Sequence, residues 1–513
     1  MKKYERTKDS IRNIIFGLIL KIIILFGGFV TRTMLIYLVG IEYVGLDGLF
    51  SSILMLLNMA ELGFSSAIVY RLYKPIAEDN TEQVCALLNY YRHIYRWIGI
   101  VVFVLGIMVI PFLDKFISGS IPADINIYLL YLIYLFNTCF SYWFFAYNTA
   151  LLNAQNRGDM VSKVNSAVSN AKYLLQFICL LVTKSYYAYV IVIPITTLAS
   201  NIAVALIAKK YFPHYVCRGQ VSVEEKRNIT KKVSALLLNK IGVSLINGSD
   251  NVVISAFLGL KFLGIYNLYY YVFSMIYGFF TVFHSAITAG IGNSIVTESV
   301  DDNYRLFRRL FFINSCAVGF CSICLCCLYR PFMILWAGES RTLSFGFSLL
   351  MSLYFYWWMI RFVVIVFKNA QGLWWEDRFR ALLEAALNLT LNIIMVRVIG
   401  IYGITLSTII SMLIISVSWE THILFSKYFK RNMRPYLWSM LKNFLITLFA
   451  GSISYISSSL INGSNVIIFL GTLVICIVVS SIIYLLFYSR TDEFRFALDL
   501  IKKYAKTLHY ANK

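Results

Sequence analysis

The feature that most constrains the fold of this chain is an internal repeat that consists mainly of hydrophobic residues. Three pairs of similar segments recur along it: 38–45 with 257–264, 116–119 with 335–338 and, after a small deletion, 153–155 with 369–371. The first two pairs share one offset of 219 positions. A chain of this kind is predicted to fold into two similar helical lobes. In carriers, such repeats place the substrate site at the interface between the lobes, near the middle of the membrane.

The composition indicates an integral membrane protein. Of the 513 residues, 59% are hydrophobic and 14% are charged, and the mean hydropathy is +0.72, which leaves too few polar side chains to cover a soluble globule. Apolar stretches of about 20 residues, the length that crosses a bilayer, recur throughout. They begin near Ile14, Gly45, Trp97, Ile125, Ser166, Tyr189, Val233, Gly264, Leu306, Leu343, Arg380, Ile401, Tyr436 and Val466. Because lipid offers no hydrogen bonds, we predict an all-α polytopic protein with about 14 transmembrane helices.

The repeat divides these helices into two groups of six, with two helices left over. An even number of helices per repeat makes both halves enter the membrane from the same side, so the repeats are predicted to be parallel. The predicted divisions are an N-terminal six-helix lobe at 1–212, a cytoplasmic inter-lobe linker at 213–230, a C-terminal six-helix lobe at 231–430, two extra helices at 431–490 and a cytoplasmic tail at 491–513.

The net charge of +21 reflects topology rather than a nucleic-acid partner. With the N-terminus in the cytoplasm, Lys and Arg concentrate in the segments on that side, including the start of the chain and the linker 209–232. The opposite loops, such as 40–45 and 115–123, carry one basic residue or none. This is the positive-inside pattern, so we expect both termini in the cytoplasm and no binding to nucleic acid.

Catalysis is not expected. An enzyme acting outside the membrane would need acidic or histidine side chains gathered in a sizeable outer loop. The longest predicted outer segment, 331–342, offers only Glu339 and Arg341. No nucleotide-binding G-x-x-x-x-G-K-[ST] string occurs, and the ten Cys lack clustered His partners. We therefore expect no enzyme activity, no cofactor and no metal site.

Ionisable residues inside the predicted spans are the main candidates for function, because each costs a few kcal/mol at the centre of a membrane and is expected to face a wet cavity or a partner. Lys21 and Lys240 occupy equivalent positions in the two repeats. Arg32 follows Lys21 by about three helical turns and so shares its face. Lys172 and Arg361 add positive charge from other helices. A cavity lined by three to five of these cations suits an anion, above all a diphosphate.

Other roles are open for several of these residues. A lysine near a helix end can extend its ammonium group to the interface, and Arg361 can pair with Glu61 or Glu384 instead of a substrate. Asp250 and Glu61 are the acidic candidates, either for binding a coupling ion or for bracing their helices.

Short motifs resemble the polysaccharide-type flippases of the multidrug/oligosaccharidyl-lipid/polysaccharide exporter superfamily. The segments that carry the resemblance are 40–45 (Gly-Ile-Glu-Tyr-Val-Gly), 61–64 (Glu-Leu-Gly-Phe), 250–254 (Asp-Asn-Val-Val-Ile), 257–259 (Phe-Leu-Gly) and 264–266 (Gly-Ile-Tyr). Together with twelve repeated helices plus two, the resemblance covers nearly the whole chain.

The resemblance implies a V-shaped pair of six-helix lobes around a central cavity. It implies a flippase that carries undecaprenyl-diphosphate-linked oligosaccharide across the bacterial cytoplasmic membrane by alternating access, for surface or capsular polysaccharide or O-antigen assembly. Membrane lipids, glycosyltransferases and a polysaccharide polymerase are the implied partners. A peptidoglycan-precursor (lipid II) flippase is the main alternative, and a multidrug antiporter is disfavoured by the cationic cavity. A scaffold without transport activity would not explain the paired lysines.

Overall fold

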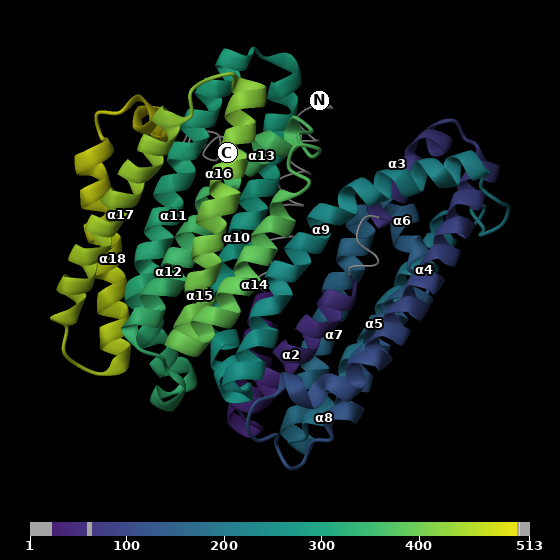
Figure 1. The fold of residues 1–513 in the computed structure, drawn as a ribbon, viewed down its shortest axis with the longest axis horizontal. Helices are drawn as coiled ribbons and strands as arrows, with labels where there is room; N and C mark the ends of the chain where they lie inside the picture. Colours follow the sequence, from purple (N-terminus) through teal and green to yellow (C-terminus); the bar gives the residue numbers. More distant parts are fainter. Residues whose placement is uncertain (1–22, 59–63, 500–501, 503–513) are drawn as a thin grey trace, which may run out of the picture. The chain divides into compact units, whose positions relative to one another are not determined.

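The structure of the chain, a computed structural model, describes residues 23–58, 64–499 and 502, and within them it is helical without strands (Figure 1). The helices of the first half are Ile23–Leu38, α2 (Ile41–Leu57), α3 (Phe64–Ala77), α4 (Thr81–Val109), η2 (Ile110–Phe116), α5 (Ile127–Trp143), α6 (Tyr147–Ala154), α7 (Gly158–Thr183), α8 (Tyr186–Tyr211), α9 (Val223–Leu258) and α10 (Leu260–Thr297). Those of the second half are α11 (Val300–Ala337), η3 (Glu339–Arg341), α12 (Phe345–Ile360), α13 (Phe362–Ala370), α14 (Arg380–Ile399), α15 (Ile401–Ser411), η4 (Met412–Val417), α16 (Ser418–Ile423), η5 (Leu424–Phe429), α17 (Arg434–Ser459) and α18 (Asn465–Tyr488).

The predicted all-α membrane fold is confirmed. Among the described residues, ten helices are long and apolar enough to cross a membrane; α5 and α6, bent by 47° at the break between them, make an eleventh if the pair is counted as one span. Of the other three predicted spans, those near Gly45 and Gly264 fall on α2 and α10, and the one near Ile14 begins outside the described residues and reaches helix Ile23–Leu38.

The chain forms two compact units, unit 1 at Met1–Asn267 and unit 2 at Leu268–Lys513. This division places α9, the first helix of the predicted second lobe, in unit 1, where it packs against α2. The boundaries at 212 and 231 were drawn from the sequence repeat rather than from packing, and they stay a prediction.

The repeat is visible in the backbone turns that end equivalent helices. Gly119 follows η2 with φ +83°, and Gly338, 219 positions later, follows α11 with φ +87°. Beyond the small deletion the offset becomes 216, and Asn156 and Gly372 both have positive φ, at 55° and 70°. Left-handed backbone is rare outside Gly and Asn, so the same turn has been kept in both repeats.

A reciprocal close contact joins the two copies of the repeated segment 38–45 and 257–264 within unit 1. A Cβ added to Gly45 would overlap the carbonyl oxygen of Leu260, and a Cβ added to Gly264 would overlap that of Ile41. Gly45 matches Gly264 and Ile41 matches Leu260 at the 219 offset, so the contact is symmetric about the repeat. The glycines are required here because helices α2 and α10 begin against each other's backbone.

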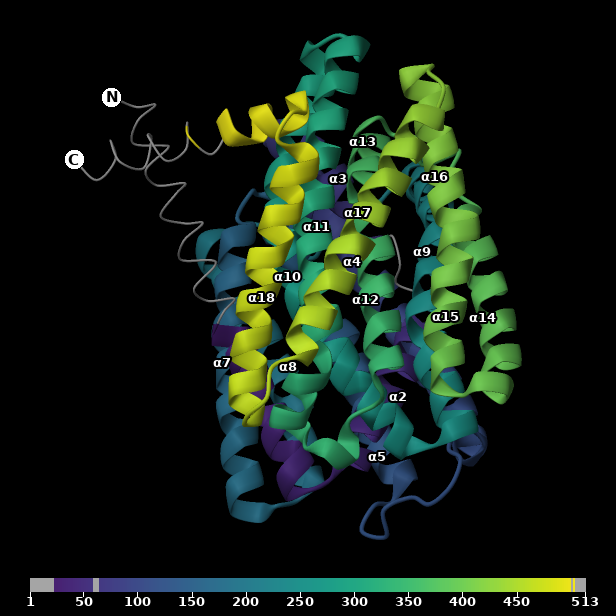
Figure 2. The ribbon, with the colours of Figure 1, turned by 90° about the vertical axis from the view of Figure 1, so that its left-hand side faces the viewer.

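The two helices without a counterpart in the repeat, α17 and α18, pack against each other and against α11 in unit 2 (Figure 2). Their shared core contains Phe312, Ile323, Cys327, Ile446, Ala450, Cys476, Ile483 and Tyr488. Burial of this apolar surface attaches the extra pair to the first long helix that lies wholly in unit 2.

Candidate functional site

The predicted site residues that the structure describes are divided between unit 1 and unit 2. Lys21 and Glu61 lie outside the described residues. Arg32, Lys172, Lys240 and Asp250 belong to unit 1, and Arg361 belongs to unit 2.

Arg32 lies beside a carboxylate, Asp47, that the sequence analysis did not single out, and Lys172 lies on the helix that meets the Arg32 helix. Arg32 Nη2 lies 3.6 Å from Asp47 Oδ2, and Arg32 Nη1 donates a hydrogen bond of 3.1 Å to the carbonyl of Asn267. Lys172, on α7, lies beyond the 4 Å of an ion pair from Asp47 and interacts with its charge only at longer range. The side chains of Arg32 and Asp47 are 19% and 24% exposed. We call Arg32, Asp47 and Lys172 the cationic cluster.

Two tyrosines hold the carboxylate of the cationic cluster in place. Tyr134 on α5 donates its hydroxyl to Asp47 Oδ1 at 2.7 Å, and the Tyr186 hydroxyl on α8 lies 3.2 Å from that of Tyr134. Both tyrosines are buried.

Helix Ile23–Leu38 meets α7 at Gly27, where an added Cβ would lie 3.0 Å from the Tyr173 ring. This close approach brings the helices that carry Arg32 and Lys172 together.

Lys240 and Asp250 lie on α9. Lys240 is half-buried and Asp250 is 8% exposed. Beside Asp250, the Asn251 amide donates to the Ser52 hydroxyl at 2.8 Å and so ties α9 to α2. Asn251 stands 219 positions after Arg32, so the repeat places an amide where the first copy has a guanidinium.

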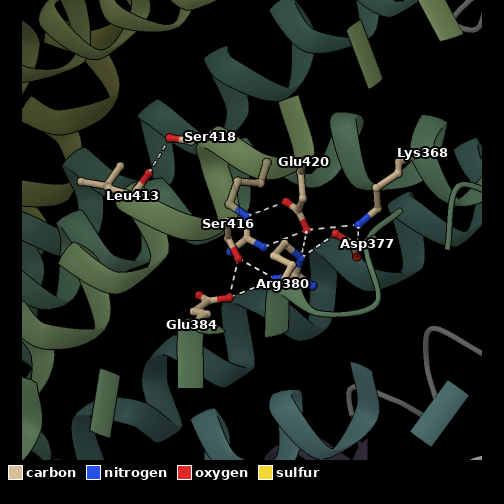
Figure 3. A network of polar contacts seen from close by, with 9 residues as sticks. Lys368, Asp377, Arg380, Glu384, Leu413, Ser416, Ser418 and Glu420 are labelled. Carbon is tan, nitrogen blue, oxygen red and sulfur yellow. Dashed lines mark hydrogen bonds and ion pairs between the residues drawn. The ribbon is translucent and has the colours of Figure 1, made fainter. Parts of the chain in front are cut away.

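Arg361 lies in a buried network of six charged side chains in unit 2, of which Figure 3 shows the part around Arg380 and Glu420. Arg361 Nε and Nη2 donate to the two carboxylate oxygens of Glu420 at 3.0 and 3.2 Å. The predicted partners of Arg361 were Glu61 or Glu384. Within the described residues its carboxylate partner is Glu420 instead, because Glu384 is taken by Arg380 at 2.9 Å.

The rest of the network links α13, the turn before α14, α14, η4 and α16. Lys368 on α13 contacts Asp377 at 2.6 Å and Glu420 at 3.3 Å. Arg380 contacts Asp377 at 2.9 Å and Glu420 at 3.2 Å, and it donates to Ser416, which itself donates to Glu384. The members are all buried: Arg361, Lys368, Asp377, Arg380, Glu384 and Glu420. We call these six residues the ion network.

The ion network is electrically balanced, with three cations and three carboxylates. Each of its cations is bound to at least one carboxylate of the network. For Arg361 to bind a substrate, its pair with Glu420 must therefore be broken. The network also lies against irregular helix, because the π-helical segments η4 and η5 flank α16, which carries Glu420. Single π-helical turns inside longer helices are frequent at functional sites.

Sequence reasoning missed Asp47, Lys368, Asp377, Arg380 and Glu420. Part of the ion network has a local signal, since Asp377, Arg380 and Glu384 stand at the i, i+3 and i, i+4 spacings of neighbouring helical side chains. Glu420 is a charged residue in an otherwise apolar predicted span, which is the same signal that singled out Arg32.

The chain matches a known family over more than half of its length. A family model described as "Polysaccharide biosynthesis protein" matches residues 10–298. No curated protein matches the sequence.

Solved structures of transporters share the fold. A structure described as "Lipid II flippase MurJ, inward closed conformation" is 17% identical, with a TM-score of 0.72 over 93% of this chain and 99% of that one. An inward-facing multidrug resistance MATE family transporter of the MOP superfamily is 12% identical, with a TM-score of 0.62 over 76% and 91%. A MATE transporter of Vibrio cholerae is 13% identical, with a TM-score of 0.51 over 83% and 100%. The family model confirms the resemblance to polysaccharide-type proteins that the sequence motifs indicated, and the solved structures confirm the fold.

Proposed function

Because the chain belongs to the polysaccharide biosynthesis protein family, we propose that it is a flippase for polyprenyl-diphosphate-linked oligosaccharides. It takes the diphosphate-sugar head group from the cytoplasmic leaflet, changes conformation by alternating access and releases the head group outside, while the lipid tail stays in the bilayer. The reaction serves surface or capsular polysaccharide or O-antigen assembly in the bacterial cytoplasmic membrane. Glycosyltransferases supply its substrate and a polymerase consumes its product.

The observation that carries the proposal is the cationic cluster. Two cations from helices far apart in the sequence lie in the apolar bundle of unit 1: Arg32 is 3.6 Å from the Asp47 carboxylate, and Lys172 lies on the helix that meets the Arg32 helix. A diphosphate carries closely spaced negative charges that can engage a planar guanidinium and an ammonium together. Lys21, Lys240 and Arg361 are proposed as further cations along the route, and Asp250 and Glu61 as ion-coupling or bracing groups. The excess of cations disfavours an organic cation as cargo.

A lipid II flippase is the second candidate. The observation that favours it is the 0.72 TM-score with a lipid II flippase over 99% of that chain. Both lipids present a diphosphate to the cations, so only the sugars separate the two candidates.

We expect transport to depend on Arg32. The protein is reconstituted in vesicles with a fluorescent polyprenyl-diphosphate oligosaccharide or with lipid II, and head groups that reach the opposite leaflet are quenched from outside. Arg32→Gln should slow the flipping of the preferred lipid by about tenfold or more, because a charge-assisted contact to the phosphates is lost. Arg157→Gln is the matched control, since Arg157 pairs with Asp159 at 3.5 Å at an exposed site. Transport at the normal rate by an Arg32→Gln, Lys172→Gln double variant would contradict the site, and failure of the wild type to flip either lipid would contradict the function.

We also propose that both termini lie in the cytoplasm. Cysteines introduced at Ser120 and Asn462 should react with an impermeant maleimide added to intact cells, whereas a cysteine at Ser222 should react only after the cells are opened. All three positions are exposed in the structure. Labelling of each variant is compared with the parent protein, which has its own ten Cys. Labelling from outside at Ser222 but not at Ser120 would reverse the orientation.

A further inference from the structure

We propose that Asp47 is a built-in counter-ion of Arg32, and that the substrate diphosphate replaces it as the partner of Arg32 and also engages Lys172, while Asp47 itself stays in place. The inference rests on the proposed function and adds to it a competing group within the binding site. Asp47 would thereby set which anions bind and how readily they leave.

Asp47 is held through Oδ1, whereas Arg32 approaches its other oxygen, Oδ2. Its Oδ1 accepts the Tyr134 hydroxyl at 2.7 Å, and the Tyr186 hydroxyl lies within 3.2 Å of that of Tyr134. Tyr186 is itself held by the ring of Tyr43, with the two ring centroids 5.1 Å apart. These contacts come from neutral groups on α2, α5 and α8, so they remain when the cations turn to another anion.

The contact of Asp47 with its arginine is loose. Arg32 Nη2 lies 3.6 Å from Asp47 Oδ2, beyond hydrogen-bond distance, and both side chains are partly exposed. The ion network of the same protein provides the contrast. There Arg361 binds both oxygens of Glu420 at 3.0 and 3.2 Å, and the two side chains are 8% and 1% exposed. The Arg361–Glu420 pair is buried and hydrogen-bonded through both carboxylate oxygens. The Arg32–Asp47 pair is longer and partly exposed, so another anion can replace Asp47 as the partner of Arg32.

The exchange favours a ligand with more than one negative charge. A single carboxylate would only replace the charge that Asp47 already supplies, and it would gain little. A diphosphate group brings at least two charges on adjacent phosphates, so it can bind Arg32 and Lys172 at the same time. Repulsion from Asp47 then weakens the loaded state and helps the head group to leave.

The test measures binding and transport separately in the Asp47→Asn variant. Binding of inorganic diphosphate to the detergent-solubilised full-length protein is measured by calorimetry, and flipping is measured in vesicles. Removing the competing charge should tighten diphosphate binding by about tenfold, since a like charge beside the ligand is lost. The flipping rate under saturating substrate should fall, because release becomes slower. Asp47→Glu, which keeps the charge, should resemble the wild type in both assays.

Asp114→Asn is the matched control. Asp114 also accepts a tyrosine hydroxyl at 2.7 Å, from Tyr128, but at an exposed site outside the cationic cluster. This variant should leave both measurements unchanged. A structural role for Asp47 would weaken binding and transport together, so weaker or unchanged diphosphate binding by a well-folded Asp47→Asn protein would overturn the proposal.

The two proposals fail in different ways. If the wild type flips lipid-linked oligosaccharide but Asp47→Asn does not bind diphosphate more tightly, the counter-ion proposal is wrong and the flippase function is retained. If Asp47→Asn tightens diphosphate binding but the wild type flips neither lipid, the anion-binding site is retained and the proposed transport function is wrong.

Discussion

Replacing Glu420 with glutamine is expected to produce a protein that melts at a much lower temperature and accumulates poorly in the membrane. Glu420 contacts all three cations of the ion network, namely Arg361, Lys368 and Arg380. Its loss would leave three buried cations against two carboxylates. Removing one partner of a buried ion pair typically costs about 3–5 kcal/mol, because the remaining charge stays buried without compensation. Thermal unfolding of the detergent-extracted protein, followed by size-exclusion chromatography, measures the effect.

A second variant tests whether the loss of stability comes from the unbalanced buried charge or from the loss of the Glu420 side chain itself. Arg361→Met combined with Glu420→Gln restores two cations against two carboxylates, so the double variant should be more stable than Glu420→Gln alone. Glu78→Gln is the surface control, because Glu78 pairs with Lys74 at 3.7 Å and the two side chains are 54% and 82% exposed. That change should have little effect, as is usual for exposed pairs. A Glu420→Gln protein that melts like the wild type would contradict the structural role of the network.

The second large effect is expected at the contact between the repeated segments. In Gly264→Ala, the new methyl group would overlap the carbonyl oxygen of Ile41, and a backbone oxygen cannot turn away as a side chain can. Helices α2 and α10 must separate, at a cost of about 1–3 kcal/mol that is typical of overpacking. Gly264→Leu should be worse. The readout is again the melting temperature, together with the yield of folded protein.

Gly290→Ala tests the same substitution on the same helix without the contact. Nothing lies within 4 Å of a Cβ added at Gly290. This change should be neutral or stabilise the protein by up to about 1 kcal/mol, because alanine favours a helix interior over glycine. Equal destabilisation at both positions would mean that the close approach of α2 and α10 is not the cause.

The helical class and the repeat were predictable because both depend on local pattern. Apolar length identifies a span, and the 219 offset brings Gly45 and Gly264 into register without any knowledge of packing. The 47° bend between α5 and α6 and the π-helical segments η4 and η5 were not predicted. A hydropathy pattern shows how long an apolar segment is, but the bend and the hydrogen-bond register of each turn are decided by the helices that pack around it.

The candidate site was predictable in its residue types but not in its pairings. Charged residues in apolar spans pointed to Arg32, Lys172 and Arg361. Whether such a cation is accessible depends on the helices beside it: Arg32 meets a partly exposed Asp47, whereas Arg361 meets a buried Glu420 from α16. Those partners stand 15 and 59 positions away along the chain, and no helical spacing indicates either pairing.

The charge balance of the ion network has a consequence for how the protein responds to an electric field across the membrane. Each elementary charge moved through 100 mV changes the energy by about 2.3 kcal/mol. The ion network has three positive and three negative charges, so a displacement of the network as one body does no net work in that field. The cationic cluster of Arg32, Lys172 and Asp47 has one positive charge in excess, and a bound diphosphate reverses its sign. A field that drives the loaded cluster in one direction therefore drives the empty cluster in the other.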